Sequence, residues 1–162
     1  MNTRVGIGYD SHRYVAGRPL RIGGVTVPHT HGLMGHSDGD VALHALIDAL
    51  LGAAALGDIG QQFPDDDPQW RGVDSAKLLR TVVEKVRQAG FAIGQADLTV
   101  MAERPKIGQH VPAMRAATAK ALGVDPAAVS FKAKTNEGMG WIGRGEGVAA
   151  IAVATLVPAA TG

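Results

Sequence analysis

The sequence predicts an α/β (α+β) fold, in which one mixed β-sheet packs on helices that cover one of its faces. The first observation is that strand-like and helix-like stretches alternate along the chain. The second is the length of 162 residues, which suits one buried core rather than two. The third is composition: hydrophobic residues make up 46% and charged residues 19%, as in a folded soluble protein. We therefore expect a single domain over residues 1–162.

Two strand-like stretches precede the first helix. Residues 4–10 (RVGIGYD) begin as a strand, and residues 20–28 (LRIGGVTVP) form a short strand or ribbon that is broken at Gly23 and Gly24. A loop follows, and its histidines have no matching partners in the sequence, so we expect them at the surface.

A helix is predicted in residues 37–56 (SDGDVALHALIDALLGAAAL). Ser37 and Asp40 form its start signal, a variant of the capping box. Helical spacing puts five apolar residues on one face, namely Leu43, Ile47, Leu50, Leu51 and Ala54.

The second half of the chain continues the alternation. After a polar loop, Asp74 caps a helix that runs through Ala89 and stops at Gly90. The elements expected after it are a half-buried strand at 96–103, a helix at 110–122, and two strands at 128–135 and 147–157 with a glycine-rich stretch between them.

Charge and composition exclude several classes of partner. A formal net charge of +1 offers no global field for nucleic acid or an anionic membrane. The absence of cysteine excludes disulfides and thiolate metal ligands, and it fits a reducing compartment. We see no signal peptide, and the longest apolar run, residues 148–157, is too short to span a bilayer. We expect a cytoplasmic protein that binds neither nucleic acid nor membrane.

A metal site is suggested by the motif GYDSHR. Asp10 and His12 are two residues apart on a predicted strand, so both side chains leave the same face about 6.5 to 7 Å apart along the chain and can converge on one ion. His44 is the candidate third ligand, and either Asp40 or Asp48 can orient its ring from one helical turn away. Two histidines and one carboxylate suit Zn2+ with a fourth position open. The alternative is that Asp10 accepts turn hydrogen bonds and the histidines have no ligand.

Other polar residues allow two interpretations each. His36 precedes the helix start, where free N–H groups favour anions, or it is an ordinary loop histidine. Asp65 and Asp67 can bind a second cation or belong to a solvated loop.

Two groups near the end of the chain are equally open. Thr135 and Glu137 place a hydroxyl beside a carboxylate at a strand end, or they form a turn. Arg144 and Glu146 make either an ion pair or an anion site at a subunit interface.

Four stretches together identify a family resemblance: GYDSHR (8–13), GGVTVPHTHGLMGHSDGDVALHALIDALLGAAALGDIGQQFPDDDP (23–68), MAERPKI (101–107) and KAKTNEGMGWIGRGEG (132–147). They resemble the 2-C-methyl-D-erythritol 2,4-cyclodiphosphate synthase family, from Arg4 to about Val157. The resemblance implies a homotrimer with active sites between neighbouring subunits. It implies a phosphorus–oxygen lyase of the non-mevalonate isoprenoid pathway, which closes 4-diphosphocytidyl-2-C-methyl-D-erythritol 2-phosphate to the cyclic diphosphate and releases CMP.

The resemblance also implies roles for individual residues. Asp10, His12 and His44 would hold Zn2+, and Glu137 would bind a second ion, Mg2+ or Mn2+, together with the substrate diphosphate. His36 and Thr135 would stabilise the transition state. The implied substrate-binding residues are Asp10, Ser11, His12, His36, Ser37, Asp58, Ile59, Gly60, Phe63, Pro64, Asp65, Asp66, Asp67, Ala102, Glu103, Arg104, Pro105, Lys106, Ile107, Gly108, Lys134, Thr135, Asn136, Glu137, Trp141 and Arg144.

Some expectations stay open at this point. Trp141 stands where many relatives carry Phe, and the KTNEG stretch (134–138) replaces a Thr-Thr-Glu version. The resemblance also implies a possible isoprenoid diphosphate in the central cavity, and the sequence leaves open whether this chain binds one. The rival functions are a noncatalytic trimeric module that binds metal and nucleotide, and a zinc phosphodiesterase in which water attacks a phosphorus.

Overall fold

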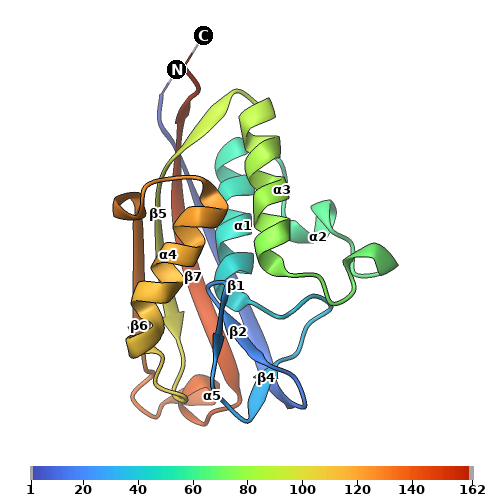
Figure 1. Ribbon diagram of the computed structural model, residues 1–162, viewed down its shortest axis with the longest axis vertical. Coiled ribbons are helices and arrows are strands. Elements are labelled where there is room, and N and C mark those ends of the chain that lie inside the picture. The colour runs from blue at the N-terminus through green and yellow to red at the C-terminus, as the bar shows by residue number, and fades with distance from the viewer. Residues whose placement is uncertain (1, 161–162) are drawn as a thin grey trace.

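The computed structural model describes residues 2–160 and contains a five-stranded mixed sheet with helices on one face (Figure 1). The strand order is β4-β1-β7-β5-β6. The parallel pair is β5 with β6, and the other neighbours are antiparallel. The bounds are β1 (Arg4–Ala16), β4 (His31–Leu33), β5 (Phe91–Met101), β6 (Val129–Lys134) and β7 (Gly147–Pro158), and a separate ribbon pairs β2 (Leu20–Ile22) with β3 (Val25–Val27).

Three long helices pack on the same side of this sheet: α1 (Val41–Ala54), α3 (Ser75–Gln88) and α4 (Val111–Leu122). The short helical segments are α2 (Ile59–Gln62), α5 (Gly140–Gly143), η1 (Pro68–Trp70), η2 (Gly108–His110) and η3 (Pro126–Ala128). The predicted mixed sheet with helices on one face is therefore confirmed. None of the helices in residues 2–160 is long and apolar enough to cross a membrane.

No helix of residues 2–160 covers the opposite face of the sheet, which exposes large apolar side chains (Figure 1). On β1, Val5 is 65% exposed, Ile7 71% and Tyr9 57%. Because side chains alternate along a strand, the residues between them face the helices, and these are Gly6, Gly8 and Asp10. β1 thus exposes apolar side chains on the uncovered face of the sheet and directs Asp10 toward the helices.

Glycines let α1 approach β1 closely. A Cβ atom at Gly8 would lie 1.9 Å from the Ala45 oxygen, and one at Gly6 would lie 1.9 Å from the Ala49 oxygen. Only residues without a side chain fit at these points. The close approach brings His44, the fourth residue of α1, beside the inward-facing residues of β1.

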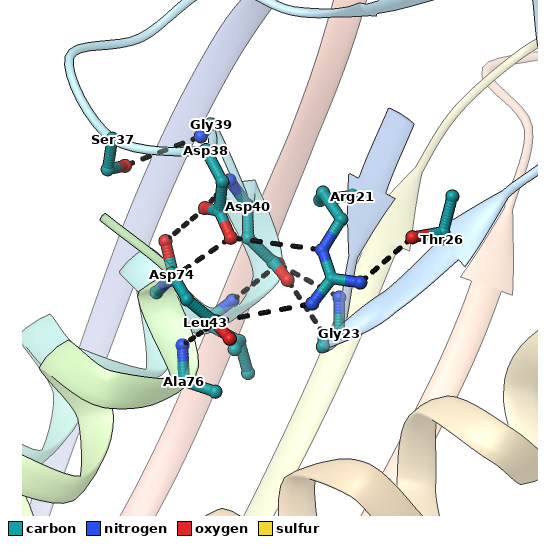
Figure 2. Close-up of polar contacts among 12 residues, drawn as sticks. Arg21, Gly23, Thr26, Ser37, Asp38, Gly39, Asp40, Leu43, Asp74 and Ala76 are labelled. Atoms are coloured by element: carbon teal, nitrogen blue, oxygen red, sulfur yellow. Dashed lines mark hydrogen bonds and ion pairs between the residues drawn. The ribbon is translucent and has the colours of Figure 1, made fainter. Parts of the chain in front are cut away.

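The start of α1 differs from the prediction. The helix begins at Val41 with Asp40 as its N-cap, not at Ser37. The fully buried Asp40 carboxylate accepts hydrogen bonds from the N–H groups of Leu43 (3.1 Å), Gly23 (2.8 Å) and Gly24 (2.7 Å) (Figure 2). Burial and the nearby charge of Asp38 raise the pKa of Asp40, although the three donors oppose that shift. Asp40 therefore ties the β2–β3 turn to the helix.

Several boundaries were predicted wrongly, among them the start of β5, which lies at Phe91 rather than at residue 96. β1 continues to Ala16, so Asp10 and His12 lie inside the strand and pair with Ala150 and Val148 of β7. The predicted loop that contains His31 forms β4, because this short segment pairs with the end of β1. The glycine-rich stretch before β7 contains the short helix α5. Strand pairing over long sequence distances leaves little local signal, which explains the errors at β1 and β4.

Candidate active site

The predicted metal ligands Asp10, His12 and His44 lie together. The Asp10 Oδ2 atom is 2.8 Å from His12 Nε2 and 3.1 Å from His44 Nδ1, and the two nitrogens are 3.1 Å apart. A tetrahedral ion with bonds of about 2.0 to 2.1 Å holds neighbouring ligand atoms about 3.3 Å apart. The three donor atoms already match that spacing, so the residues fit a divalent cation of this type.

The charge of Asp10 dominates the electrostatics of this cluster. Burial alone would raise the pKa of Asp10, but the hydrogen bonds and charges of His12 and His44 lower it to about 2. Burial would likewise lower the pKa of His44, whereas the hydrogen bond and charge of Asp10 raise it. Both shifts mean that the cluster favours positive charge at its centre, whether it comes from protons or from a cation.

On its Nε2 side, the ring of His44 faces two serines rather than Asp40 or Asp48. Its Nε2 atom lies 2.8 Å from the Ser75 Oγ and 3.0 Å from the Ser37 Oγ. The Asp40 carboxylate is occupied by the backbone donors described above, and the Asp48 carboxylate accepts the Ile59 N–H at 2.8 Å. The prediction that Asp40 or Asp48 orients His44 is therefore wrong.

A cavity of about 260 Å³ adjoins the cluster. Its walls include six further residues from the predicted substrate-binding set, namely His36, Ser37, Ile59, Gly60, Phe63 and Asp65. The His36 Nε2 is 3.4 Å from the carbonyl oxygen of Asp67, which holds the ring at the wall. The site thus places metal ligands and a polar cavity side by side.

Sequence reasoning missed three residues in the wall of this cavity: Gly35, Trp70 and Leu78. The Trp70 ring packs edge-on against Phe63, with ring centroids 5.0 Å apart and an interplanar angle of 82°. The local signal that could have identified Trp70 as a cavity residue is its position as a tryptophan in an otherwise polar loop.

The other residues of the 58–67 segment have local structural contacts. The Asp58 carboxylate caps α2 by accepting the Gln61 N–H at 2.9 Å, and the Asp67 carboxylate accepts the Gln69 N–H at 3.1 Å. Pro64 and Asp66 are exposed and do not line the cavity.

A second group of predicted residues gathers at the adjacent carboxyl ends of β5 and β6. The Ala102 N–H donates to the Lys134 oxygen at 2.9 Å, and the Glu103 carboxylate accepts the N–H groups of Asn136 (3.0 Å) and Gly138 (3.1 Å). The predicted residues here are Ala102, Glu103, Arg104, Pro105, Lys106, Ile107, Gly108, Lys134, Thr135, Asn136 and Glu137. The connection after β5 is therefore fastened to the turn after β6.

Of the β5–β6 group, Arg104 alone among residues 2–160 shares the lining of a hollow with a metal ligand, His12. Among residues 2–160, nothing from the β5–β6 group lines the cavity beside the metal cluster. A larger hollow of about 840 Å³ is lined by Ser11, His12, Arg104 and Trp141 among others. Arg144 pairs with Glu146 at 2.8 Å, which supports the ion-pair interpretation of these two residues. A single chain thus presents two partial sites.

Comparisons with known proteins match almost the whole chain. The sequence profile of the YgbB family matches residues 3–157. The 2-C-methyl-D-erythritol 2,4-cyclodiphosphate synthase of Bordetella petrii is 64% identical over 156 residues, which are 96% of this chain and 96% of that protein. The bifunctional IspDF of Campylobacter jejuni superposes with a TM-score of 0.92 at 42% identity, over 96% of this chain and 42% of that one. A 2C-methyl-D-erythritol-2,4-cyclodiphosphate synthase in its CDP-bound form gives a TM-score of 0.87 at 42% identity, over 95% of this chain and 100% of that one.

Proposed function

The chain belongs to the YgbB family, whose similar curated members are 2-C-methyl-D-erythritol 2,4-cyclodiphosphate synthases, and we propose that it catalyses the cyclisation for which they are named. The substrate is 4-diphosphocytidyl-2-C-methyl-D-erythritol 2-phosphate. An oxygen of its 2-phosphate attacks the β-phosphorus, the bond to the α-phosphate breaks, and CMP leaves. This is a phosphorus–oxygen lyase reaction of the non-mevalonate isoprenoid pathway. The observation that carries the proposal is the Asp10–His12–His44 cluster beside a cavity lined by His36.

The reaction needs no protein nucleophile, because the attacking group belongs to the substrate. The protein's task is to position the phosphates and to neutralise their charge. We assign stabilisation of the transition state to His36 and Thr135, with Ser37 as a substrate contact. The position of His36 at the cavity wall, beside the metal cluster, supports its part in this assignment.

The donor sets match the proposed ions. Asp10, His12 and His44 would hold Zn2+, and Glu137 would bind Mg2+ or Mn2+ through hard oxygen ligands. When bound, such ions withdraw electron density from phosphate oxygens as Lewis acids. Glu137 has a positive φ of 52° and its N–H lies 3.4 Å from the Thr135 Oγ, so the two side chains belong to one tight turn.

We assign the cytidine subsite to residues 102–108. Ala102 and Ile107 are buried, whereas Arg104 and Lys106 are exposed, so backbone groups and two cations are available to a nucleotide. The CDP-bound relative supports a cytidine nucleotide as the ligand class.

We further propose that the chain forms a homotrimer with active sites between subunits. Two observations support it: no member of the β5–β6 group within residues 2–160 lines the cavity beside the metal cluster, and β1 exposes the apolar row Val5, Ile7 and Tyr9. A neighbouring subunit can cover that row and bring its own β5–β6 group to the metal cluster.

Replacing Ile7 by glutamate is expected to dissociate the assembly. Burying an isoleucine contributes about 1.5 to 3 kcal/mol, and a buried carboxylate opposes association further, so the dissociation constant should rise at least about 10-fold. Analytical ultracentrifugation measures the dissociation constant of the assembly. The control is Gln88→Glu, which adds the same side chain at the exposed end of α3. An Ile7→Glu protein that stays trimeric would place the interface elsewhere.

The proposed reaction is tested by incubating the protein with the diphosphocytidyl substrate, Zn2+ and Mg2+ and following the products by 31P NMR. We expect a cyclic diphosphate and an equal amount of CMP, and His36→Ala should lower turnover by about 100-fold. His110→Ala, at the start of α4, serves as the control. Linear phosphates would favour the phosphodiesterase, whereas cytidine nucleotide binding without turnover would favour the noncatalytic module.

A further inference from the structure

We propose that Ser75 and Asp38 act as positioning residues for the metal ligand His44: they hold the proton of its ring on Nε2 and keep Nδ1 directed at the cation. The inference rests on the metal site proposed above, and it concerns residues that belong to neither the predicted ligands nor the predicted substrate contacts. It is carried by the hydrogen bonds that connect α1, α3 and the loop between β4 and α1.

The buried ring of His44 has different partners on its two nitrogens. Nδ1 lies 3.1 Å from both Asp10 Oδ2 and His12 Nε2, whereas Nε2 lies 2.8 Å from the Ser75 Oγ. A neutral imidazole carries one N–H and one free lone pair. If Nδ1 is the metal donor, the proton must stay on Nε2, and the group facing Nε2 must accept a hydrogen bond.

Ser75 can accept that hydrogen bond because Asp38 takes the proton of its hydroxyl. The Ser75 Oγ donates to Asp38 Oδ1, and the Ser75 N–H donates to Asp38 Oδ2 at 3.1 Å. A carboxylate accepts and cannot donate. With its only hydrogen directed at Asp38, the hydroxyl of the fully buried Ser75 presents a lone pair to His44.

Asp38 is itself held in place. It accepts the Asp40 N–H at 3.1 Å, and the guanidinium of Arg21 on β2 lies 3.9 Å from its Oδ2 atom. Figure 2 shows the guanidinium of Arg21 facing the carboxylates of both Asp38 and Asp74, the second of which is 4.0 Å away. The guanidinium places a positive charge beside the Asp38 carboxylate, and a carboxylate can only accept hydrogen bonds.

Ser37 does not fix the position of the proton on the His44 ring in the same way. Its Oγ lies 3.0 Å from His44 Nε2 and accepts the Gly39 N–H at 3.3 Å. No carboxylate among residues 2–160 accepts a hydrogen bond from Ser37, so its hydroxyl hydrogen can turn either way. The fixed direction of the hydrogen bond to His44 therefore comes from Ser75 and Asp38.

The test measures the affinity of the full-length protein for zinc, by competition with a chromophoric chelator. Ser75→Ala removes the hydroxyl that accepts the hydrogen bond from His44. Asp38→Asn replaces one carboxylate oxygen by an NH2 group, so the side chain can no longer accept hydrogen bonds on two oxygens from the N–H and the hydroxyl of Ser75. Each is expected to weaken zinc binding by about 10- to 100-fold. The matched control is Asp74→Asn, which removes the same charge beside Arg21 but does not touch the Ser75 hydroxyl.

A double variant separates positioning from a general loss of structure. Because both residues act through one hydrogen bond, Ser75→Ala combined with Asp38→Asn should bind zinc no more weakly than Ser75→Ala alone, whereas independent effects would multiply. Thermal unfolding of the metal-free proteins gives the effect on stability separately.

Each outcome decides one question. A wild-type protein that binds no zinc would overturn the metal site and with it the proposed function. If the wild-type protein binds zinc but Ser75→Ala and Asp38→Asn bind it as tightly as Asp74→Asn does, the inference is overturned and the proposed function stands. The same holds if the effects of Ser75→Ala and Asp38→Asn on zinc affinity multiply in the double variant.

Discussion

Replacing His44 by alanine is expected to abolish cyclisation while the chain stays folded. The substitution removes one of three converging donor atoms, and the remaining Asp10 and His12 cannot hold the ion in the same position. Lewis-acid assistance is worth several kcal/mol, so we expect turnover to fall by at least about 10³-fold. Release of CMP measures the activity, and elemental analysis of the dialysed protein measures the zinc content.

Two further variants make this result interpretable. His110→Ala removes a histidine at the start of α4, and it should retain both zinc and activity. His12→Ala removes a half-buried ligand, so it tests the same site with less disturbance of the core than the loss of buried His44. Full activity in both ligand variants would eliminate the zinc assignment, since circular dichroism and sedimentation report folding independently.

Replacing Gly8 by alanine is expected to destabilise the protein by at least about 3 kcal/mol. The new Cβ would lie 1.9 Å from the Ala45 oxygen and 2.8 Å from the Ala49 nitrogen, so α1 has to move away from β1. His44 moves with the helix, and zinc affinity should fall together with stability. Urea denaturation of the purified protein, followed by circular dichroism, measures the free energy of unfolding.

The control for this substitution is Gly52→Ala, in α1 itself. Its Cβ would meet no atom within 4 Å, and alanine is favoured over glycine in a helix by about 0.5 to 1 kcal/mol. We therefore expect the control to be slightly more stable than the wild type. Equal stability of Gly8→Ala and the wild type would mean that β1 and α1 can separate freely, which would remove the proposed reason for the two glycines.

Local patterns predicted much of this fold and the core of the site. Helical spacing located α1, capping by Asp74 located α3, and alternation located β5. The two-residue spacing of Asp10 and His12 placed both side chains on one strand face, where the structure has them. The resemblance then supplied roles that no spacing could give, and those roles remain proposals.

The neighbours of His44 needed the tertiary structure. The sequence offered Asp40 and Asp48, each one helical turn away, yet their carboxylates bind backbone N–H groups elsewhere. The actual partner Ser75 is 31 residues distant, on another helix.

The difference has a physical cause. Periodicity and capping act between residues a few positions apart, so the sequence by itself determined the elements and the strand face that carries the ligands. The hydrogen bonds of a buried ring depend on which donors and acceptors packing brings within about 3 Å, and those groups come from distant parts of the chain. Only the tertiary structure could decide that two serines face His44, and that no member of the β5–β6 group within residues 2–160 lines the cavity beside the metal cluster.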